Sequence, residues 1–266
     1  MADVDTAPAM LSILMPVRNE GINLRIMLKI LRAVVDVPHE VLVVYDREDD
    51  DSGPVVDAMS GDYPNLRALH NTTGVGVLKA IRVGVAAARG QCVLIFAADE
   101  VGPVLAIDDM LALIDEGCDF VSCTRYAHGG RRLGGSWIGG VLSRLANWMF
   151  CRLSGLKLTD ATTGIKMFRR EIFDRLHLEA RPVGWAVTFE MAIKAQLAGM
   201  KLGEVPIVSI DRLYGGTSTF SVGPWVVEYL RWFMWGLRQT SRRRGSAPPV
   251  AIRIPAATGM GGKVHM

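Results

Sequence analysis

The chain has 266 residues, of which 50% are hydrophobic and 21% charged, a balance that suits one large α/β domain with a substantial core. Its net charge of +3 is too small to indicate a nucleic-acid-binding protein. The four cysteines show no zinc-ligand spacing, and we interpret them as reduced cytosolic thiols.

Neither a targeting segment nor a membrane span is predicted. Residues 1–10 lack the basic and apolar stretches of a signal peptide and are expected to form a flexible tail. Arg144 and Arg152 interrupt the most apolar region, residues 137–156, so no apolar run reaches the length of a span. Any membrane contact is therefore expected to lie in the interface.

The first hundred residues alternate between short apolar strands and helices. The predicted strands cover residues 11–15, 40–45, 66–70 and 91–98, and the predicted helices cover 23–35, 54–59 and 77–88. Such alternation implies right-handed βαβ crossovers and a mainly parallel sheet flanked by helices. The sequence therefore predicts an α/β fold.

The apolar run at 91–98 ends at two adjacent carboxylates, Asp99 and Glu100. Its lack of helical period indicates a strand buried on both faces. Ligands of open α/β sheets bind beyond the carboxyl ends of the strands, where a carboxylate can hold a divalent cation that neutralises a diphosphate. Asp99 is equally suited to cap the next helix, and this stretch alone does not separate the two interpretations.

Two earlier turns contain residues suited to ligand binding. The acidic turn 46–52 is either a solvated loop, as charge runs usually are, or a turn that places Asp46 against a base or ribose. Gly74 and Gly76 precede a helix, where backbone N–H groups can approach an anion. Two glycines alone favour a plain turn, so these alternatives stay open.

A change in composition follows the helix predicted over 106–116 and the strand predicted over 120–123. Residues 125–135 are rich in glycine and include Arg125, Arg131 and Arg132. We interpret this segment as a mobile lid whose guanidiniums meet phosphate. An ordinary exposed connection is the alternative, which the length and basic content of the segment disfavour.

Further helices are predicted over 138–156 and 188–198, and a strand over 202–210. Asp160 lies in a polar turn and, taken alone, is favoured as a turn residue. The last helix, 224–240, sets tryptophan beside arginine, which is typical of a helix in a membrane interface; packing on its own domain is the alternative. Residues 241–266 are expected to be a disordered basic tail that anionic lipid attracts.

Several motifs, taken together and in order, resemble those of a known family. They are Pro16-Val17-Arg18-Asn19-Glu20, Val43-Val44-Tyr45-Asp46, Gly74-Val75-Gly76, Ser122-Cys123-Thr124-Arg125-Tyr126 with Gly129-Gly130, the stretch from Asp160 to Arg170, and Arg212, Gly216 and Ser218. The set is similar to that of the inverting GT-A glycosyltransferases of family 2, and most of all to the dolichyl-phosphate mannosyltransferase-like branch. The resemblance implies a GT-A (Rossmann-like) catalytic domain over residues 11–223.

The resemblance also implies an activity. It is the inverting transfer of a mannose- or glucose-like sugar from a nucleotide sugar to a polyprenyl or dolichyl phosphate, by a cytoplasmic protein peripherally associated with the inner face of the cell membrane. A Mg²⁺ or Mn²⁺ ion would be held by Asp99 and Glu100. The implied residues are, for catalysis, Asp99, Arg125 and Asp160; for donor binding, Pro16, Arg18, Glu20, Asp46, Gly74 and Lys79; and for the phosphates or acceptor, Arg131, Arg132, Arg144, Lys166, Arg212 and Ser218.

The sequence departs from the family pattern at two motif positions. Ala97 stands at the first position of the D-x-D motif, so one metal-binding carboxylate is absent, and Glu100 is the candidate to compensate. Tyr45 replaces the first Asp of the nucleotide strand. Two other functions stay open: a soluble glycosyltransferase acting on a small molecule or protein, and a catalytically silent nucleotide-sugar-binding protein. The motif residues that remain, among them Asp99 and Arg125, favour an enzyme.

Overall fold

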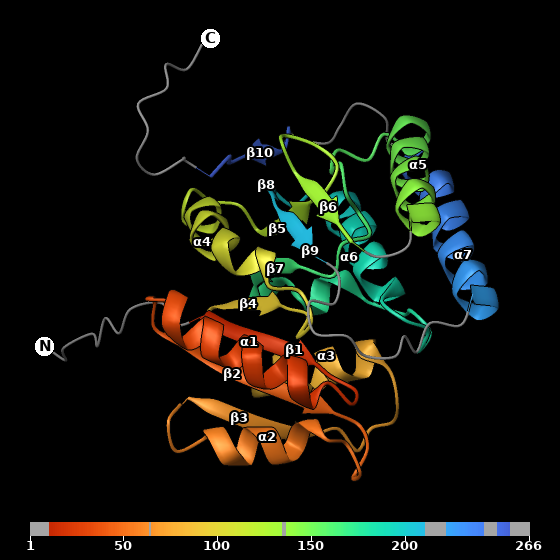
Figure 1. Ribbon diagram of the computed structural model, residues 1–266. Helices are drawn as coiled ribbons and strands as arrows, with labels where there is room; N and C mark the ends of the chain where they lie inside the picture. Colours follow the sequence, from red (N-terminus) through yellow and green to blue (C-terminus); the bar gives the residue numbers. More distant parts are fainter. Residues whose placement is uncertain (1–10, 64, 135–136, 211–221, 242–248, 256–266) are drawn as a thin grey trace, which may run out of the picture.

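A central sheet of eight strands organises the protein in the computed structural model, which describes residues 11–63, 65–134, 137–210, 222–241 and 249–255 (Figure 1). The strand order is β10-β8-β5-β7-β4-β1-β2-β3. Neighbouring strands are parallel except at β7, which runs antiparallel to both β4 and β5. The strands are β1 (Leu11–Pro16), β2 (His39–Tyr45), β3 (Leu66–His70), β4 (Cys92–Ile95), β5 (Phe120–Thr124), β7 (Lys166–Arg169), β8 (Leu202–Pro206) and β10 (Ala251–Ile252).

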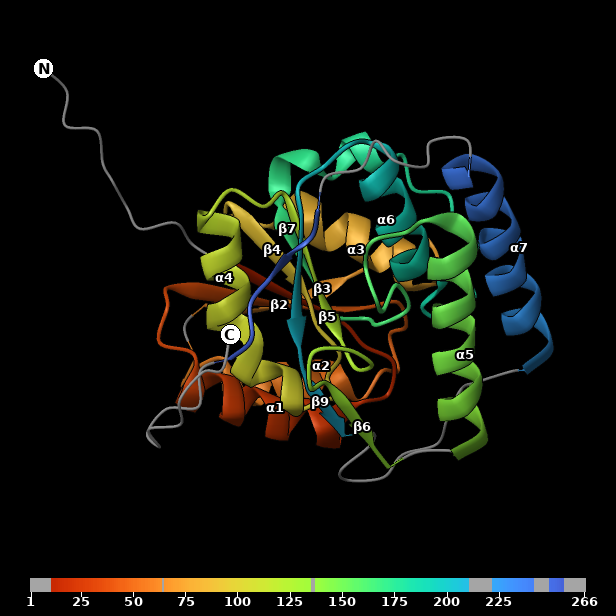
Figure 2. The same cartoon turned by 90° about the horizontal axis from the view of Figure 1, so that it is seen from above.

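Helices cover both faces of the sheet, which explains why β4 in its centre is buried along its whole length. Successive side chains of a strand point to opposite faces, so on β1 Ile13 and Met15 enter one core cluster and Leu14 enters the other. Helices α1 (Gly21–Val34), α2 (Ser52–Met59) and α4 (Ile107–Asp115) pack on the first cluster. Helices α3 (Val77–Ala87), α5 (Trp137–Ser154), α6 (Ala186–Leu197) and α7 (Val222–Ser241) lie on the second (Figure 2).

Short elements complete the fold. A 3-10 helix, η1 (Gly102–Ala106), leads into α4, and two more, η2 (Arg170–Ile172) and η3 (Asp174–Leu176), follow β7. Strands β6 (Arg131–Leu133) and β9 (Val208–Ile210) form a separate two-stranded parallel sheet. The glycine-rich segment expected to be a lid therefore contains a strand, which pairs with a partner far along the chain.

The last described residues also differ from expectation. Residues 241–266 were expected to be disordered, but Ala251 and Ile252 add a parallel strand to the edge of β8. Arg253 then donates to Asp109 at 2.9 Å and to Glu116 at 2.8 Å. An open edge strand offers unpaired backbone groups, and these two ion pairs hold the added segment in register.

The last helix places its tryptophans differently from the expected membrane-interface pattern. Trp232 is only 2% exposed, and its indole N–H donates to the buried Glu228 at 3.0 Å. Trp225 and Trp235 are half-buried. The tryptophans therefore pack one side of α7 onto its own domain, as the alternative interpretation held, and Trp232 joins the second core cluster.

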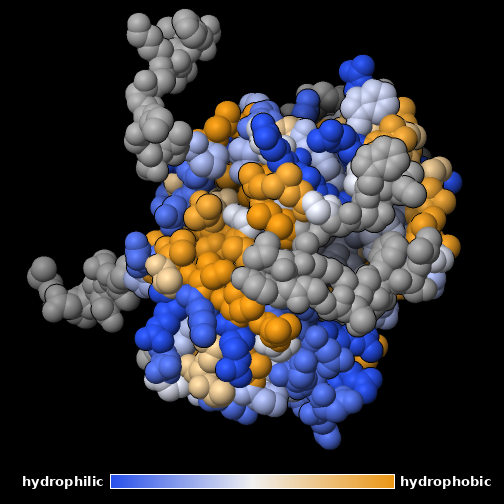
Figure 3. Space-filling model, in the orientation of Figure 1, coloured by the Kyte–Doolittle hydropathy of each residue, from blue (hydrophilic) through white to orange (hydrophobic). Residues whose placement is uncertain are grey.

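An exposed apolar surface lies on the outer sides of α5 and α7, which pack side by side (Figure 2). Figure 3 shows hydrophobic side chains along these two helices on the right of the molecule. We call this the α5/α7 apolar surface; its exposed members are Val141, Leu145, Trp148, Met149, Leu153, Val226, Val227, Leu230 and Met234. Within the described part of the chain, none of the helices has the length and apolarity that a membrane span requires.

Candidate active site

The carboxyl ends of four parallel strands meet at one edge of the sheet and bring most of the predicted residues together. Pro16 ends β1, Asp46 follows β2, Asp99 follows β4 and Arg125 follows β5. Sheet topology alone dictates this convergence, because parallel strands present their carboxyl ends on the same side.

The acidic turn after β2 organises the start of α1. Asp50 accepts the backbone N–H of Asn19 at 3.1 Å, and Asp51 accepts that of Gly21 at 2.9 Å. The N-terminus of a helix leaves backbone donors unsatisfied and favours negative charge, so these carboxylates stabilise the loop after β1. Glu20 lies in that loop and accepts the side-chain amide of Asn23 at 2.7 Å, while Arg18 is exposed.

The two carboxylate oxygens of Asp46 differ in their hydrogen-bond partners. Its Oδ2 accepts the backbone N–H of Gly76 at 3.0 Å, whereas its buried Oδ1 meets no hydrogen-bond donor among the described residues. A buried carboxylate oxygen left unsatisfied costs free energy, and a donor on a bound ligand would satisfy it. Gly74 and Gly76 both have positive φ, +117° and +111°, so the turn needs glycine at both positions. A side chain at Gly74 would also collide with the ammonium of Lys79.

Asp99 and Glu100 lie half-buried in the turn after β4. Glu100 Oε1 accepts the hydroxyl of Ser209, on β9, at 2.5 Å. Within the described ranges, no three His, Cys, Asp or Glu side chains converge to hold a metal by themselves. The donor set fits an ion such as Mg²⁺ that relies on one or two carboxylates and on substrate phosphates. Ala97 packs against the core and offers no ligand.

Arg125 and Asp160 form a bidentate ion pair at the end of β5. Arg125 Nε donates to Asp160 Oδ2 at 2.7 Å and its Nη2 donates to Oδ1 at 3.0 Å. The backbone N–H of Arg125 also donates to Oδ2, at 3.2 Å. Burial alone would raise the pKa of Asp160, but the charge and hydrogen bonds of Arg125 outweigh it and hold that pKa below its ordinary value. Asp160 is fully buried, so it orients the guanidinium and does not itself face a substrate.

Two guanidiniums lie close to the ring of Tyr126. The guanidinium carbon of Arg125 is 5.1 Å from the ring centroid, and that of Arg144, on α5, is 5.4 Å from it. The Tyr126 hydroxyl donates to Ser143 at 2.9 Å. Cation–π contacts of this length stabilise both cations near one ring, so α5 contributes Arg144 to the same edge as Arg125.

The two predicted lid arginines occupy consecutive positions of β6. The register pairs Arg131 with Val208 and Arg132 with Ser209. Because successive side chains alternate between faces, Arg132 shares the buried face of Ser209, whose hydroxyl reaches Glu100. Arg131 shares the outer face with Val208, which is 42% exposed. Only Arg132 is thus directed to the side of the acidic edge.

Lys166 does not reach the surface, contrary to its expected role in phosphate binding. It is fully buried on β7, and its Nζ donates to the Ser122 hydroxyl at 2.7 Å. Burial lowers the pKa of Lys166 to about 8. The ammonium therefore lies beneath the site among buried carboxylates. Arg212 and Ser218 lie outside the described residues.

Several contributors to the site were missed from the sequence. Thr162 accepts a hydrogen bond from Arg125 Nη2 at 3.1 Å, and Asn147 of α5 donates to the Thr162 hydroxyl at 2.9 Å. Glu204, a buried carboxylate on β8, accepts the backbone N–H of Thr159 at 2.8 Å. A single carboxylate inside an otherwise apolar strand was the available signal for Glu204, because such residues are almost never buried without partners.

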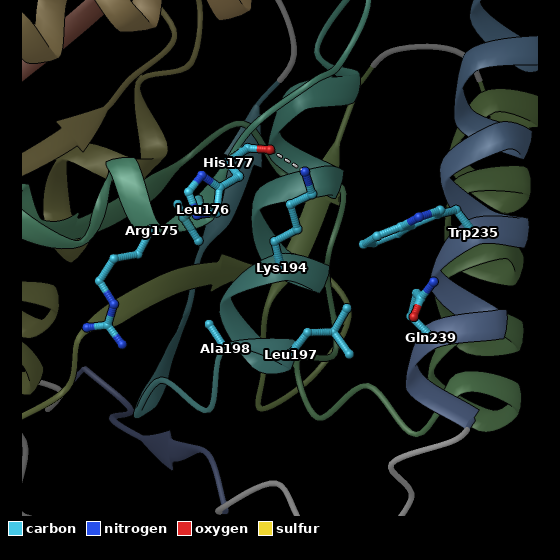
Figure 4. Close-up of a pocket in the computed structure, with 8 residues that line it drawn as sticks. All are labelled: Arg175, Leu176, His177, Lys194, Leu197, Ala198, Trp235 and Gln239. Carbon is cyan, nitrogen blue, oxygen red and sulfur yellow. Dashed lines mark hydrogen bonds between the residues drawn. The ribbon is translucent and has the colours of Figure 1, made fainter.

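A separate pocket of about 270 Å³ lies between η3, α6 and α7 (Figure 4). None of the predicted site residues lines it. Its lysine, Lys194, points toward the backbone carbonyl of His177 and forms an ion pair with Glu190 at 2.8 Å. The candidate active site remains the sheet edge at Asp46, Asp99 and Arg125.

Comparison with curated proteins gives two relatives of similar length. The chain is 28% identical over 208 residues to a polyprenol monophosphomannose synthase of Mycolicibacterium smegmatis, covering 76% of this chain and 78% of that protein. It is 28% identical over 232 residues to an undecaprenyl-phosphate mannosyltransferase of Micrococcus luteus, covering 82% and 92% of the two chains.

Solved structures and a family model agree on the fold. A crystal structure of glucosyl-3-phosphoglycerate synthase from Mycobacterium tuberculosis, in complex with Mn²⁺, UDP and glucosyl-3-phosphoglycerate, superposes with a TM-score of 0.66 at 17% identity. The superposition covers 86% of this chain and 80% of that one, and the shared architecture is GT-A. The model of glycosyl transferase family 2 matches residues 12–176. The predicted enzyme class is confirmed: the chain belongs to glycosyl transferase family 2.

Proposed function

We propose that this glycosyltransferase transfers a hexose, with mannose the first candidate, from a nucleotide sugar to a polyprenyl phosphate, with inversion at the anomeric carbon. The single observation that carries the proposal is the arrangement of one sheet edge. There, one oxygen of Asp46 meets no hydrogen-bond donor among the described residues, Asp99 lies in the turn after the central strand, and Asp160 holds the Arg125 guanidinium. The names of the two mannosyltransferase relatives support the acceptor class.

The donor nucleotide would lie over the loops after β1 and β2. A ribose hydroxyl or a base N–H would donate to Asp46 Oδ1 and satisfy that buried oxygen. The backbone N–H of Gly76 already donates to the other oxygen of this carboxylate, so Oδ1 is the one left for the ligand. Arg18 and Glu20 border this space from the loop after β1.

The transfer step needs little general-base help, because an acceptor phosphate monoester is already anionic at neutral pH. A phosphate oxygen attacks the anomeric carbon and forms the new C–O bond. The bond from that carbon to the diphosphate oxygen breaks, and its electron pair leaves with the nucleoside diphosphate. Attack from the face opposite the leaving group inverts the configuration.

Stabilisation of the leaving diphosphate then sets the rate. Arg125, preorganised by its ion pair, would supply guanidinium donors to its oxygens, and Arg132 would bind the phosphate of the incoming acceptor. A Mg²⁺ or Mn²⁺ ion held by Asp99, with Glu100 as the neighbouring carboxylate, would neutralise charge on the departing phosphates. Asp160 acts in this scheme by positioning Arg125.

The lipid acceptor would be met at a membrane interface on the inner face of the cell membrane. The α5/α7 apolar surface supports this placement because aliphatic residues exposed on two adjacent helices suit the acyl boundary. Exposed arginines border it on the same helices and suit anionic headgroups. They are Arg144, Arg152, Arg231 and Arg238.

The test is a panel of labelled GDP- and UDP-sugars supplied with polyprenyl phosphate in detergent, with and without Mn²⁺. We expect one donor to give a labelled, lipid-extractable product that mild acid releases. A parallel arm supplies 3-phosphoglycerate, and product there alone would favour a soluble, small-molecule transferase instead. Tight binding of a nucleotide sugar with no product in either arm would favour a silent binding protein.

A further inference from the structure

A fully enclosed carboxylate on β8, Glu204, lies beneath the Arg125–Asp160 pair and takes no direct part in the proposed chemistry. It is 1% exposed. Its Oε1 accepts the backbone N–H groups of Thr159, at 2.8 Å, and of Asp160, at 3.3 Å. A buried carboxylate that accepts backbone N–H groups fixes the peptide units that donate to it. Glu204 thus fixes the backbone from which the Asp160 side chain projects.

A chain of hydroxyl groups extends the influence of Glu204 to β5. The Thr159 hydroxyl donates to Glu204 Oε2 at 2.8 Å, so its proton is committed to the carboxylate. Thr124 Oγ1 lies 2.7 Å from Thr159 Oγ1 and must then be the donor in that pair. Thr124 Oγ1 in turn accepts the backbone N–H of Tyr126, at 3.3 Å. All donors therefore point toward Glu204, and the chain starts at the residue that follows Arg125.

Both supports of Arg125 consequently converge on the same carboxylate. The Asp160 turn binds the guanidinium, and the Thr124–Tyr126 segment carries the Arg125 backbone. We propose that Glu204 is a positioning residue for the transferase reaction, which sets the orientation of Arg125 through Thr159, Thr124 and Asp160. The inference deepens the proposed function and rests on it for the role of Arg125.

The protonation state of Glu204 decides the direction of the hydrogen bonds around it. Burial raises the pKa of Glu204 to about 7. His128 Nε2 lies 3.9 Å from its Oε2. The other titratable groups that act on it or feel its charge are Asp160, Lys166, Cys123 and Cys151. A proton on Oε2 would turn that oxygen from acceptor to donor and reverse the hydroxyl chain, so turnover should fall as Glu204 becomes protonated.

The first experiment compares Glu204→Gln with Glu190→Gln. Glu190 is a matched control, because it is also a buried glutamate that accepts two backbone N–H groups, those of Glu179 and Ala180, but it lies on α6 against Lys194. We expect Glu204→Gln to lower kcat by about 10- to 100-fold with little change in the donor KM, as loss of a supporting hydrogen-bond partner typically does. Glu190→Gln should keep the wild-type kcat.

The pH profile supplies the readout that a purely structural role would not change. Wild-type kcat should fall on the acid side with a midpoint near the pKa of Glu204, and this limb should be absent from Glu204→Gln, which carries no titrating group. An unchanged kcat and acid limb in Glu204→Gln, or an equal loss in Glu190→Gln, would overturn the proposal. Donor hydrolysis by water can be followed in the same series, so that failure of the polyprenyl phosphate assignment is detected separately.

A second pair of variants keeps the inference testable if Glu204→Gln does not fold. Thr159→Val removes only the hydroxyl between Glu204 and Thr124, whereas Thr159→Ser retains it. We expect the valine variant to lose kcat and the serine variant to retain most of it. Equal activity of the two would show that the hydroxyl chain does not orient Arg125.

Discussion

Arg131 and Arg132 are adjacent in the sequence, yet their side chains leave opposite faces of strand β6. Arg132 shares its face with the buried Ser209, which donates to Glu100, and Arg131 shares the outer face with Val208. The sequence predicted a phosphate clamp from both residues. The alternation of the strand directs only Arg132 to the side of the acidic edge, so we propose the phosphate contact for Arg132.

We therefore expect Arg132→Ala to raise the KM for polyprenyl phosphate by about 10- to 100-fold, the scale of a hydrogen bond to a charged group. Arg131→Ala is the matched control and should show wild-type saturation curves for donor and acceptor. Equal effects of the two substitutions would mean that Arg131 and Arg132 do not lie on opposite faces of β6.

Because Arg125 and Asp160 form an ion pair, we expect substitutions at these two residues to have non-additive effects on the free energy of unfolding. Asp160→Asn would leave the guanidinium largely buried without its counter-charge, which typically costs about 3–5 kcal/mol of stability. Chemical denaturation of Asp160→Asn, Arg125→Gln and the double variant measures this. The double variant should be less destabilised than the sum of the single variants, and strict additivity would contradict a direct interaction.

Asp99→Asn should lower turnover by about two to three orders of magnitude, the scale of losing a transition-state electrostatic element. It should also raise the Mn²⁺ concentration needed for half-maximal activity, and chelation by EDTA should abolish wild-type activity. Asp108→Asn, at an exposed position on α4, serves as control. Near-normal turnover and metal dependence in Asp99→Asn would remove Asp99 from the mechanism.

Lys166 should make stability depend on pH with a defined sign. Its folded-state pKa of about 8 lies below the ordinary value of 10.5. Between these values the unfolded chain binds more protons than the folded one, so stability should rise with pH by up to about 1.4 kcal/mol per unit. The difference in unfolding free energy between wild type and Lys166→Met isolates this contribution. The exposed Lys201→Met gives the baseline, and a flat difference from pH 8 to 10 would contradict the burial of the charge.

The α5/α7 apolar surface predicts binding to anionic vesicles. Val227→Asp with Leu230→Asp should reduce sedimentation with phosphatidylglycerol vesicles by about tenfold or more, since each substitution replaces an exposed aliphatic side chain with a charge. Ile22→Asp, on the exposed side of α1, should bind like wild type. Point substitutions suit this test better than truncation, because Trp232 of α7 is part of the core.

Local patterns were sufficient to predict the parallel half of the fold. The strands at β1, β2 and β4 are short apolar runs followed by helices with regular apolar spacing, and both signals lie within a few residues of one another. The edge that holds Asp46 and Asp99 follows from that topology. These strands and helices can be predicted without knowing which distant segments they pair with.

Non-local pairing accounts for most of what was missed. β7 was not identified as a strand of the sheet because its partners β4 and β5 precede it by many residues, and β6 is a strand only through its pairing with β9. The burial of Lys166 and of Glu204 depends equally on neighbours from three strands. The tryptophans of α7 were ambiguous because the same composition suits a lipid interface and a core.

The position of β7 has one further consequence. The chain leaves the sheet after β5 and returns on the adjacent strand, with Ser122 paired to Lys166 at the base. The excursion between them, residues 125–165, contains β6 and α5 and is closed at its root by the Arg125–Asp160 pair. The two ends of this segment therefore lie on adjacent, paired strands. Replacing residues 125–165 with the corresponding segment of another family member would leave the loops after β1 and β2 unchanged. Under the proposed function, the residues that meet the acceptor and those that meet the donor would then lie on separate segments of the chain.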